Sequence, residues 1–321
     1  MHNFKRILAV LLVAGLMIGL NEGLMYLLYP YTYTRADMHH IITEEYDDLL
    51  VGSSHGKCGL DPQAMAEVTG RKTLNVCQGG QYPVDSCHLV MEAARHQNIK
   101  RVIYELDPGY WVTEPNQSAD YVTFYQEMPW STVKLSYFAD KMMKADFRTV
   151  LFPWYFYRNQ IKRIPEFVHQ KQSDVYKNYG IEPFASEVQT YREDGFIARH
   201  PLPSDRQQED VPHLWQFAEP EKDSVEGFEK MVRFCKKEGI QLIVVTTPIP
   251  KATYEKYKSH YEAAEQYFTD YLEKLQVPYY CYLTTQESDI PQDLEEFADY
   301  DGHMYEEAAG RFSRIFAENM K

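Results

Sequence analysis

The chain has 321 residues, enough for one large domain or two small ones and for a sizeable hydrophobic core. Apolar residues make up 44% and charged residues 25%, which is ordinary globular usage and excludes a disordered chain, whereas the aromatic share of 14% is high. Acidic residues outnumber basic ones by 47 to 33, and a net charge of −14 argues against binding to nucleic acid, whose phosphates would be repelled.

Residues 1–30 form a separate apolar segment. Lys5 and Arg6 precede a stretch whose helix, over residues 7–29, would span the ~30 Å of membrane hydrocarbon. Because no small-x-small cleavage signal follows, we favour an uncleaved anchor over a cleaved signal peptide or a buried helix of a soluble protein. The positive-inside rule then places Lys5 and Arg6 in the cytoplasm and residues 31–321 outside the cell.

After the anchor, residues 31–43 are expected to be a polar tether and the acidic run at 44–48 a solvated stretch. Asp61, Pro62 and Gly70 supply the cap, first position and stop of a helix. Short apolar segments, several rich in branched residues, predict strands at 49–51, 72–76, 100–107, 239–250 and 277–283. Helices are predicted at 61–70, 83–98, 224–238, 254–275 and 306–319.

Strands that alternate with helices predict an α/β fold with an open, mainly parallel five-stranded sheet and helices on both faces. Such sheets bind ligands outside the carboxyl ends of their strands. Residues 108–222 interrupt the alternation and contain all four tryptophans. We expect a partly helical insertion that caps the sheet, with aromatics that either pack its own core or form a sugar-stacking or partner-docking face.

The five cysteines are too few and too scattered for a disulfide framework or a zinc cluster, and no CxxC motif occurs. We expect most of them to be small buried hydrophobic residues. An odd number outside the cell leaves at least one thiol free, and one disulfide remains open.

Two distant residues are candidates for nucleophilic catalysis. Ser54 follows a predicted strand in a glycine-bearing turn, so its hydroxyl would project at the carboxyl end of the sheet. His303 precedes the last predicted helix, and its loop can return to the same edge. A serine needs a base within reach and a third group to hold the imidazole, for which Asp301 is the candidate. The turn at Gly79 and Gly80 offers backbone N–H groups to an oxyanion.

Other interpretations of these residues remain open. Ser53 is a rival nucleophile, and the serine and histidine could be ordinary turn and helix-entry residues. His55 could be a surface side chain or a neighbour of the site. Asp299, Asp301 and His303 could bind a metal, but no partner cluster has ligand spacing, so we assign no metal and no cofactor.

Three short segments resemble blocks I, II and V of the SGNH/GDSL hydrolase superfamily: LLVGSSHG at the first strand, NVCQGG after the second, and DGH before the last helix. The resemblance implies a flavodoxin-like fold in which Ser54 is the nucleophile and His303 the base. It also implies that the backbone N–H groups of Ser54 and Gly80 stabilise the oxyanion. We expect the side chains or backbone of Asn75, Gly79, Asp107 and His55 to line the site.

The chain departs from the family pattern in two places. The family's aspartate lies three residues before the histidine, where this chain has Tyr300. Asp301 or, as second choice, Asp299 would then orient the imidazole, or serine and histidine would work as a dyad. Block III, Gly-x-Asn-Asp, is replaced by ELDPGYW, so one oxyanion donor is lost and Asp107 has no assigned role.

An N-terminal anchor, an external domain and a degenerate block III are similar to members that work beside membrane O-acyltransferases, such as the D-alanylation and alginate-acetylation proteins. This likeness implies acyl transfer through an acyl-serine, by an O-acyltransferase or an esterase, on a cell-surface polysaccharide or teichoic-acid-like polymer. The implied partners are that polymer, the membrane and a membrane-bound O-acyltransferase. The alternative is an inactive SGNH scaffold that binds the polymer or the acyltransferase.

Overall fold

The computed structural model describes residues 2–114, 119–144, 147–201, 214–283 and 289–321. Its centre is a five-stranded sheet in the order β2-β1-β3-β6-β7, in which every neighbouring pair is parallel. The predicted parallel sheet is therefore confirmed. Its strands are β1 (Asp48–Val51), β2 (Thr73–Asn75), β3 (Arg101–Glu105), β6 (Gln241–Thr246) and β7 (Tyr279–Cys281).

The inner strands are apolar on both sides because both faces of the sheet are covered. Leu49 and Val51 point into one hydrophobic core, and Leu50 between them points into the other. All three side chains are fully buried. Burial of each contributes about 1.5–3 kcal/mol of transfer free energy, so the pattern strongly favours this placement of β1.

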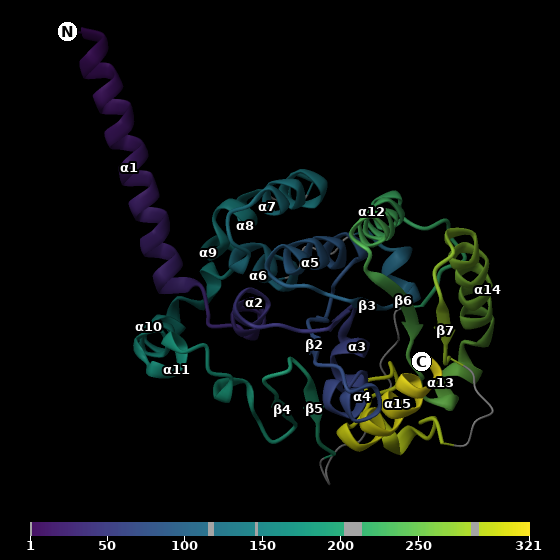
Figure 1. Cartoon of the computed structure of the whole chain (residues 1–321). Helices are drawn as coiled ribbons and strands as arrows, with labels where there is room; N and C mark the ends of the chain where they lie inside the picture. Colours follow the sequence, from purple (N-terminus) through teal and green to yellow (C-terminus); the bar gives the residue numbers. More distant parts are fainter. Residues whose placement is uncertain (1, 115–118, 145–146, 202–213, 284–288) are drawn as a thin grey trace.

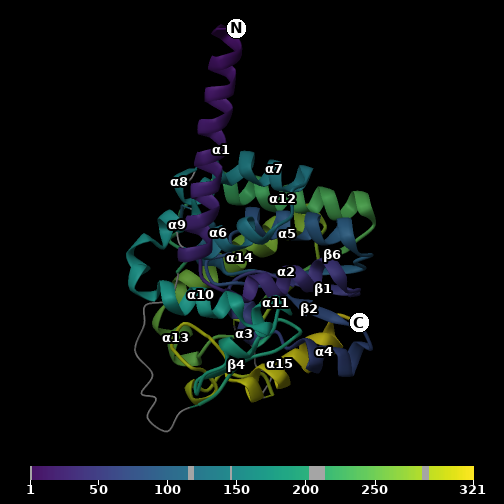
Figure 2. The ribbon, with the colours of Figure 1, turned by 90° about the vertical axis from the view of Figure 1, so that its left-hand side faces the viewer.

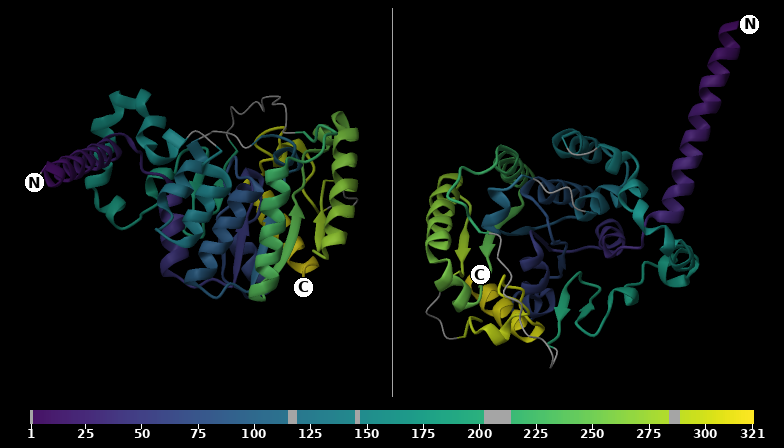
Figure 3. Two further views of the ribbon diagram at one scale, coloured as in Figure 1. Left: turned by 90° about the horizontal axis from the view of Figure 1, so that it is seen from above. Right: turned by 180° about the vertical axis from the view of Figure 1, so that it is seen from behind.

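Helices form one layer on each face of the sheet (Figures 1 and 3). One layer contains α5 (Pro83–His96), α12 (Lys222–Glu238) and α14 (Lys258–Leu275). The other contains α3 (Ser54–Gly59), α4 (Pro62–Thr69) and α15 (Glu306–Asn319), and α4 packs on α15. The architecture thus places the loops that follow the strands at one edge, between the two layers.

The capping residues confirm the predicted start and stop of α4. The Asp61 side chain accepts hydrogen bonds from the backbone N–H groups of Gln63 and Ala64, and Gly70 ends the helix in the left-handed region at φ 68°. The predicted long helix at 254–275 is wrong in one respect. It is two helices, α13 (Lys251–Lys256) and α14, because Tyr257 between them leaves the helical conformation.

The helix α1 (His2–Leu28) projects from the body of the protein (Figures 1 and 2). It is long and apolar enough to cross a membrane, and the most apolar window within it is not buried against the rest of the chain. Length and composition therefore support the predicted anchor. Its orientation across a membrane stays a prediction.

The expected tether at 31–43 is instead the helix α2 (Tyr33–Thr43), and it is largely buried. Its polar composition is misleading because Asp37 is fully buried, where it accepts a hydrogen bond from Lys57 at 3.0 Å. The Lys57 ammonium also donates to the carbonyl oxygen of Asn75 at 3.0 Å and the hydroxyl of Tyr191 at 3.1 Å. This buried polar cluster joins α2 to α3, β2 and the insertion.

The described insertion is partly helical, as predicted, and also contains an antiparallel hairpin that was not predicted. It packs outside α5 and along the β2 side, where the backbone N–H of Asn75 donates to Asp194 O at 2.8 Å. The described residues of the insertion therefore lie along the side of the sheet, whereas a cap over its edge was predicted. Its elements are η1 (Pro108–Trp111), α6 (Ala119–Glu127), α7 (Thr132–Tyr137), η2 (Phe138–Met142), α8 (Phe147–Leu151), α9 (Pro153–Phe156), η3 (Arg158–Arg163), α10 (Ile164–Gln172), α11 (Asp174–Lys177), η4 (Glu182–Phe184), β4 (Gln189–Tyr191) and β5 (Ile197–Arg199).

The tryptophans of the insertion do not share one role. Trp111 is fully buried in the core beside the sheet, with its ring against Phe228 and Phe268. Trp215 is also buried and contacts Phe268, whereas Trp130 is 79% exposed. Part of the aromatic surplus therefore packs in the core of the main domain. Such packing was expected only within the insertion's own core.

All five cysteines are free thiols, and four of them are buried. The expectation that most are small hydrophobic core residues is confirmed. The disulfide that the sequence left open is not formed. The one cysteine that is not classed as buried, Cys281, lies on the edge strand β7.

Candidate active site

Ser54 begins α3 directly after β1, at the carboxyl edge of the sheet. The turn before it requires glycine: Gly52 has φ 147°, and a Cβ there would lie 2.5 Å from the carbonyl oxygen of Glu105. Ser53 caps α3 by accepting a hydrogen bond from the His55 backbone N–H at 3.2 Å. Ser53 is therefore committed to the turn, and Ser54 is the serine that faces the site.

The structure brings Ser54 and His303 together across 249 positions of sequence. The hydroxyl Oγ of Ser54 lies 2.8 Å from Nε2 of His303, and Nδ1 of the same ring lies 2.8 Å from Oδ2 of Asp299. A carboxylate only accepts hydrogen bonds, so the proton is on Nδ1. Nε2 is then free to accept from the serine hydroxyl, which is the arrangement that a serine nucleophile and its base require.

The predicted orienting residue Asp301 is wrong in geometry, because Asp299 holds the imidazole. The second carboxylate oxygen of Asp299 accepts the backbone N–H groups of Gly302 at 3.0 Å and His303 at 3.1 Å. The loop therefore curls around this carboxylate and turns the ring toward it. Burial tends to raise the pKa of Asp299, but the hydrogen bonds and charge of His303 outweigh it and lower the pKa below its ordinary value.

Asp301 pairs with a second histidine, His55. Its Oδ2 lies 3.6 Å from Nε2 of His55, and Oδ2 of Asp107 lies 3.4 Å from Nδ1. Burial alone would lower the pKa of His55, but the carboxylates of Asp301 and Asp107 raise it well above its ordinary value. The His55 ring lies 4.9 Å from the His303 ring. His55 is thus a buried neighbour of the site that draws Asp301 away from His303.

Glu105 is a further carboxyl group beneath the serine turn, and the sequence interpretation did not include it. Its Oε2 accepts the backbone N–H of Ser53 at 2.7 Å, while Oε1 has no hydrogen-bond partner among the described residues. Burial raises its pKa to about 7, against the lowering effect of His55. The only sequence signal was a glutamate at the end of a predicted buried strand.

The turn predicted to supply oxyanion donors lies beside the serine. A Cβ on Gly79 would be 3.8 Å from Cβ of Ser54, and Gly80 adopts φ 72°, which favours glycine. Burial raises the pKa of Tyr110 and the Gly80 backbone acts in the opposite direction, which places the Tyr110 side chain near the predicted oxyanion turn. Tyr110 belongs to η1, the segment that replaces block III.

Two of the expected lining residues have structural roles. The Asn75 amide donates to the carbonyl oxygens of Gly56 at 2.8 Å and Leu60 at 2.9 Å, and its oxygen accepts the N–H of Cys77 at 3.0 Å. It holds α3 against β2 and does not line the site. Asp107 accepts the backbone N–H of the residue two positions on, which caps η1, and contacts His55 with its other oxygen.

Three groups of the site offer metal-ligating atoms near one another. One atom each from His55, Asp301 and His303 lies within 4.8 Å of the others. Asp299, which the sequence grouped with a possible metal, is engaged with His303 Nδ1. Because Nε2 of His303 already contacts Ser54, a metal ion on this group would displace the serine hydroxyl. The arrangement therefore suits proton transfer between serine and histidine without an ion.

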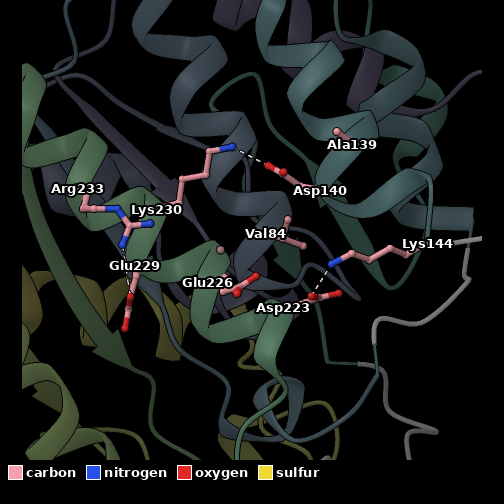
Figure 4. A pocket seen from close by; sticks show the side chains of 10 residues that line it. Val84, Ala139, Asp140, Lys144, Asp223, Glu226, Glu229, Lys230 and Arg233 are labelled. Carbon is pink, nitrogen blue, oxygen red and sulfur yellow. Dashed lines mark hydrogen bonds and ion pairs between the residues drawn. The ribbon is translucent and has the colours of Figure 1, made fainter.

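A separate charged groove lies between α12 and the η2 region of the insertion (Figure 4). Its charges pair with one another: Lys230 with Asp140 at 2.6 Å, and Lys144 with Asp223 at 2.5 Å. None of the predicted site residues lines it. Its lysine amines are engaged in these ion pairs, in contrast to the Ser54 hydroxyl beside an imidazole.

Comparison of the chain with protein-family models and with curated proteins finds no match in either.

The pKa of Glu105 predicts a pH dependence of stability. Between pH 4.5 and 7 the folded protein keeps a proton on Glu105 that the unfolded chain has released, so its free energy of unfolding falls as pH rises through this window. Glu105→Gln removes this loss. From pH 5 to pH 8 we expect the free energy of unfolding of the variant to rise by about 2–3 kcal/mol relative to that of wild type, measured by denaturant unfolding. An equal pH dependence of the two proteins, or a larger change for the exposed control Glu295→Gln, would contradict the assignment.

Proposed function

We propose that this protein carries out acyl-ester transfer at a membrane surface through a covalent acyl-Ser54 intermediate. The observation that carries the proposal is the unbroken chain of contacts from Ser54 to His303 to Asp299, at 2.8 Å for each step. The strand order supports the SGNH assignment, because the sheet strands counted in chain order run 2-1-3-4-5, the flavodoxin-like arrangement. The site also lies at the carboxyl edge, where such folds bind ligands.

In the proposed reaction, Oγ of Ser54 attacks the acyl carbonyl while Nε2 of His303 takes the serine proton. The bond from the carbonyl carbon to the leaving alcohol breaks, and His303 returns the proton to that alcohol. An incoming hydroxyl then repeats both steps in reverse and releases Ser54. The carboxylate of Asp299 stabilises the imidazolium that forms in each half of the cycle.

The tetrahedral intermediates carry a negative oxygen that needs hydrogen-bond donors. In the proposal these are the backbone N–H groups of Ser54 and Gly80. In the proposal the hydroxyl of Tyr110, which lies near the Gly80 backbone, donates its own O–H to the substrate. A tyrosine hydroxyl would then stand in for the donor lost with block III.

The acceptor in the proposal is a hydroxyl of a cell-surface polymer. An anchor that keeps the domain beside a membrane raises its effective concentration toward a membrane-bound acyl donor, such as the product of a membrane O-acyltransferase. An esterase that uses water would gain less from such tethering. The external location of the domain follows from the expected orientation of α1 and is part of the proposal.

An inactive scaffold is the second candidate function. The observation in its favour is the nearness of Tyr110 to the Gly80 backbone, because a tyrosine that blocked the oxyanion site would prevent catalysis. In that case the same fold would bind a polymer or an acyltransferase partner. The two candidates differ in whether Ser54 is nucleophilic.

Serine reactivity separates the two candidates directly. We expect a fluorophosphonate probe to label the full-length protein in detergent and Ser54→Ala to reduce labelling at least about 100-fold, because Ser54 is the serine that contacts His303 among the described residues. Ser53→Ala is the matched control and should keep most of the signal. If wild type stays unlabelled while its thermal unfolding is cooperative, the scaffold candidate replaces the enzyme.

The two aspartates of the histidine loop should differ in their effect on this reactivity. Asp299→Asn permits the wrong imidazole tautomer, so we expect the labelling rate to fall about 10²–10⁴-fold. Asp301→Asn removes a partner of His55 and should lower the rate about tenfold or less. Rates at several probe concentrations measure both effects. A larger loss for Asp301→Asn would return the orienting role to Asp301.

Transfer and hydrolysis are separated by the fate of the acyl group. With 4-nitrophenyl acetate as donor, we expect a soluble cell-wall oligosaccharide fraction to divert acetate from the free acid to acetylated oligosaccharide. Mass spectrometry of the oligosaccharides and an acetate assay measure the partition, and Ser54→Ala is the blank. Unchanged release of free acetate with no acetylated sugar would assign the protein as an esterase.

A further inference from the structure

Exposed apolar side chains outside α1 are concentrated in one part of the insertion. Among the described residues beyond α1, eight large hydrophobic side chains are exposed, and five of them fall between positions 130 and 161. Large apolar residues exposed in a cluster mark a contact surface more often than residues exposed singly. The five are Trp130 at 79% exposed, Leu135 at 59%, Met143 at 65%, Leu151 at 48% and Ile161 at 63%.

The elements that carry Leu135, Leu151 and Ile161 lie on the side of the body from which α1 projects. Figures 1 and 2 both show α7 and α8 on that side, and α1 packs against α9, η3 and α10. Val133 and Tyr137 of α7 are buried in the core. Leu135 is two positions, or about 200°, from Val133 around the helix and is therefore on the opposite face, directed away from the body.

The end of α1 is held firmly by the insertion. The ammonium group of Lys171 donates to the carbonyl oxygens of Met25, Tyr26 and Tyr29 at the carboxyl end of α1 and just beyond it. The indole N–H of Trp154 donates to Oδ1 of Asn21 at 2.9 Å. Because α1 is fixed to the insertion at these points, the membrane plane is fixed relative to the same surface.

The charge of this segment is opposite to that of the whole chain. Residues 130–163 contain seven lysines and arginines and two aspartates, whereas the chain carries −14. Arg148 and Arg158 are exposed and lie at 5.2 Å and 4.3 Å from the ring of Tyr155, and Lys162 is exposed beside them in sequence. Basic residues near an anionic membrane surface are attracted to it.

We propose that the surface formed by Trp130, Leu135, Met143, Leu151 and Ile161 lies in the interfacial layer of an anionic lipid bilayer, beside the point where α1 leaves it. Exposed aromatic and aliphatic side chains mixed with basic ones match the interface between headgroups and acyl chains. A polar glycan would not bury the aliphatic side chains of Leu135, Leu151 and Ile161 in an apolar environment. The proposal goes beyond the acyl-transfer proposal and does not depend on Ser54; it depends on α1 spanning the membrane.

Two attachments restrict the domain more than one. A single helix would let the domain rotate and tilt above the bilayer, whereas a second contact fixes the height and direction of the sheet's carboxyl edge. This role also accounts for an aromatic residue of the insertion, Trp130, that does not pack in the main core. The insertion would then serve as the platform that seats the domain on the lipid surface.

The test places an environment-sensitive NBD fluorophore on single introduced cysteines of the full-length protein in nanodiscs. The positions are Leu135→Cys and Ile161→Cys on the proposed surface, Leu16→Cys in α1, and Val188→Cys, an exposed apolar site before β4. Wild type is the labelling blank, and thermal unfolding checks each variant. Quenching by lipids with a doxyl group on the acyl chain reports contact with the bilayer.

In discs with anionic phosphatidylglycerol, we expect NBD at residues 135 and 161 to be quenched at least half as much as at residue 16, and NBD at residue 188 to be unquenched. Quenching at residue 16 with none at 135 or 161 would overturn the proposal and leave the anchor intact. No quenching at residue 16 would overturn both the proposed lipid contact and the assignment of α1 as a membrane anchor. Neither outcome bears on the reactivity of Ser54.

Basic residues provide the second arm. The triple variant Arg148→Glu, Arg158→Glu and Lys162→Glu should lower quenching at residue 135 several-fold in anionic discs while residue 16 stays quenched. The matched control reverses three exposed lysines on α13 and α14: Lys251→Glu, Lys258→Glu and Lys274→Glu. An equal effect of the two triple variants would show that net charge, and not this surface, governs the contact, and would overturn the proposal.

Discussion

The hydrogen bond between the Ser54 hydroxyl and the His303 imidazole is the contact on which the interpretation of this protein depends. It joins the start of the domain to its end, and it forms only because all five strands are parallel and present their carboxyl ends at one edge. Gly52 lets the chain turn close to Glu105 after β1, and the loop before α15 returns to the same edge. A change in strand order or direction would separate the two side chains. The fold therefore brings the side chains of Ser54 and His303 together, and the neighbouring charges act on a contact that the fold has already set.

Charges around this contact are divided between two histidines. Asp299 is committed to His303 through its side chain and through two backbone N–H groups, whereas Asp301 and Asp107 flank the buried His55. The high pKa of His55 keeps a positive charge beneath the loop, and this charge compensates carboxylates that would otherwise be buried together. Glu105 lies nearby with its pKa raised by burial to about 7. His55 thus contacts Asp301, and Asp299 is the carboxylate that is hydrogen-bonded to the His303 imidazole.

The aromatic residues of the insertion divide by location, which explains why composition alone could not assign them. Trp111 belongs to the core beside the sheet, Trp154 contacts α1, and Trp130 is exposed. One segment therefore completes the main core, holds the N-terminal helix and offers an apolar surface next to it. Its composition fits these three environments because aromatic side chains combine a large apolar area with a polar or polarisable edge. The insertion is an extension of the domain and not a separate unit of packing.

The sequence by itself determined the elements whose signals are local: the buried strands, the caps of α4 and the bounds of α15. The meeting of Ser54 with His303 was an expectation from the predicted sheet and the family resemblance. Tertiary structure decided what depends on side-chain direction and remote contacts. Asp299 and Asp301 lie two positions apart, and only the loop curled around Asp299, with His55 on its other side, separates their roles. The helix α2 was not predicted because its polar composition conceals a buried residue, Asp37, whose partner Lys57 lies in another element. Periodicity records which face of an element is apolar, but it carries no information about which buried polar group will meet which partner.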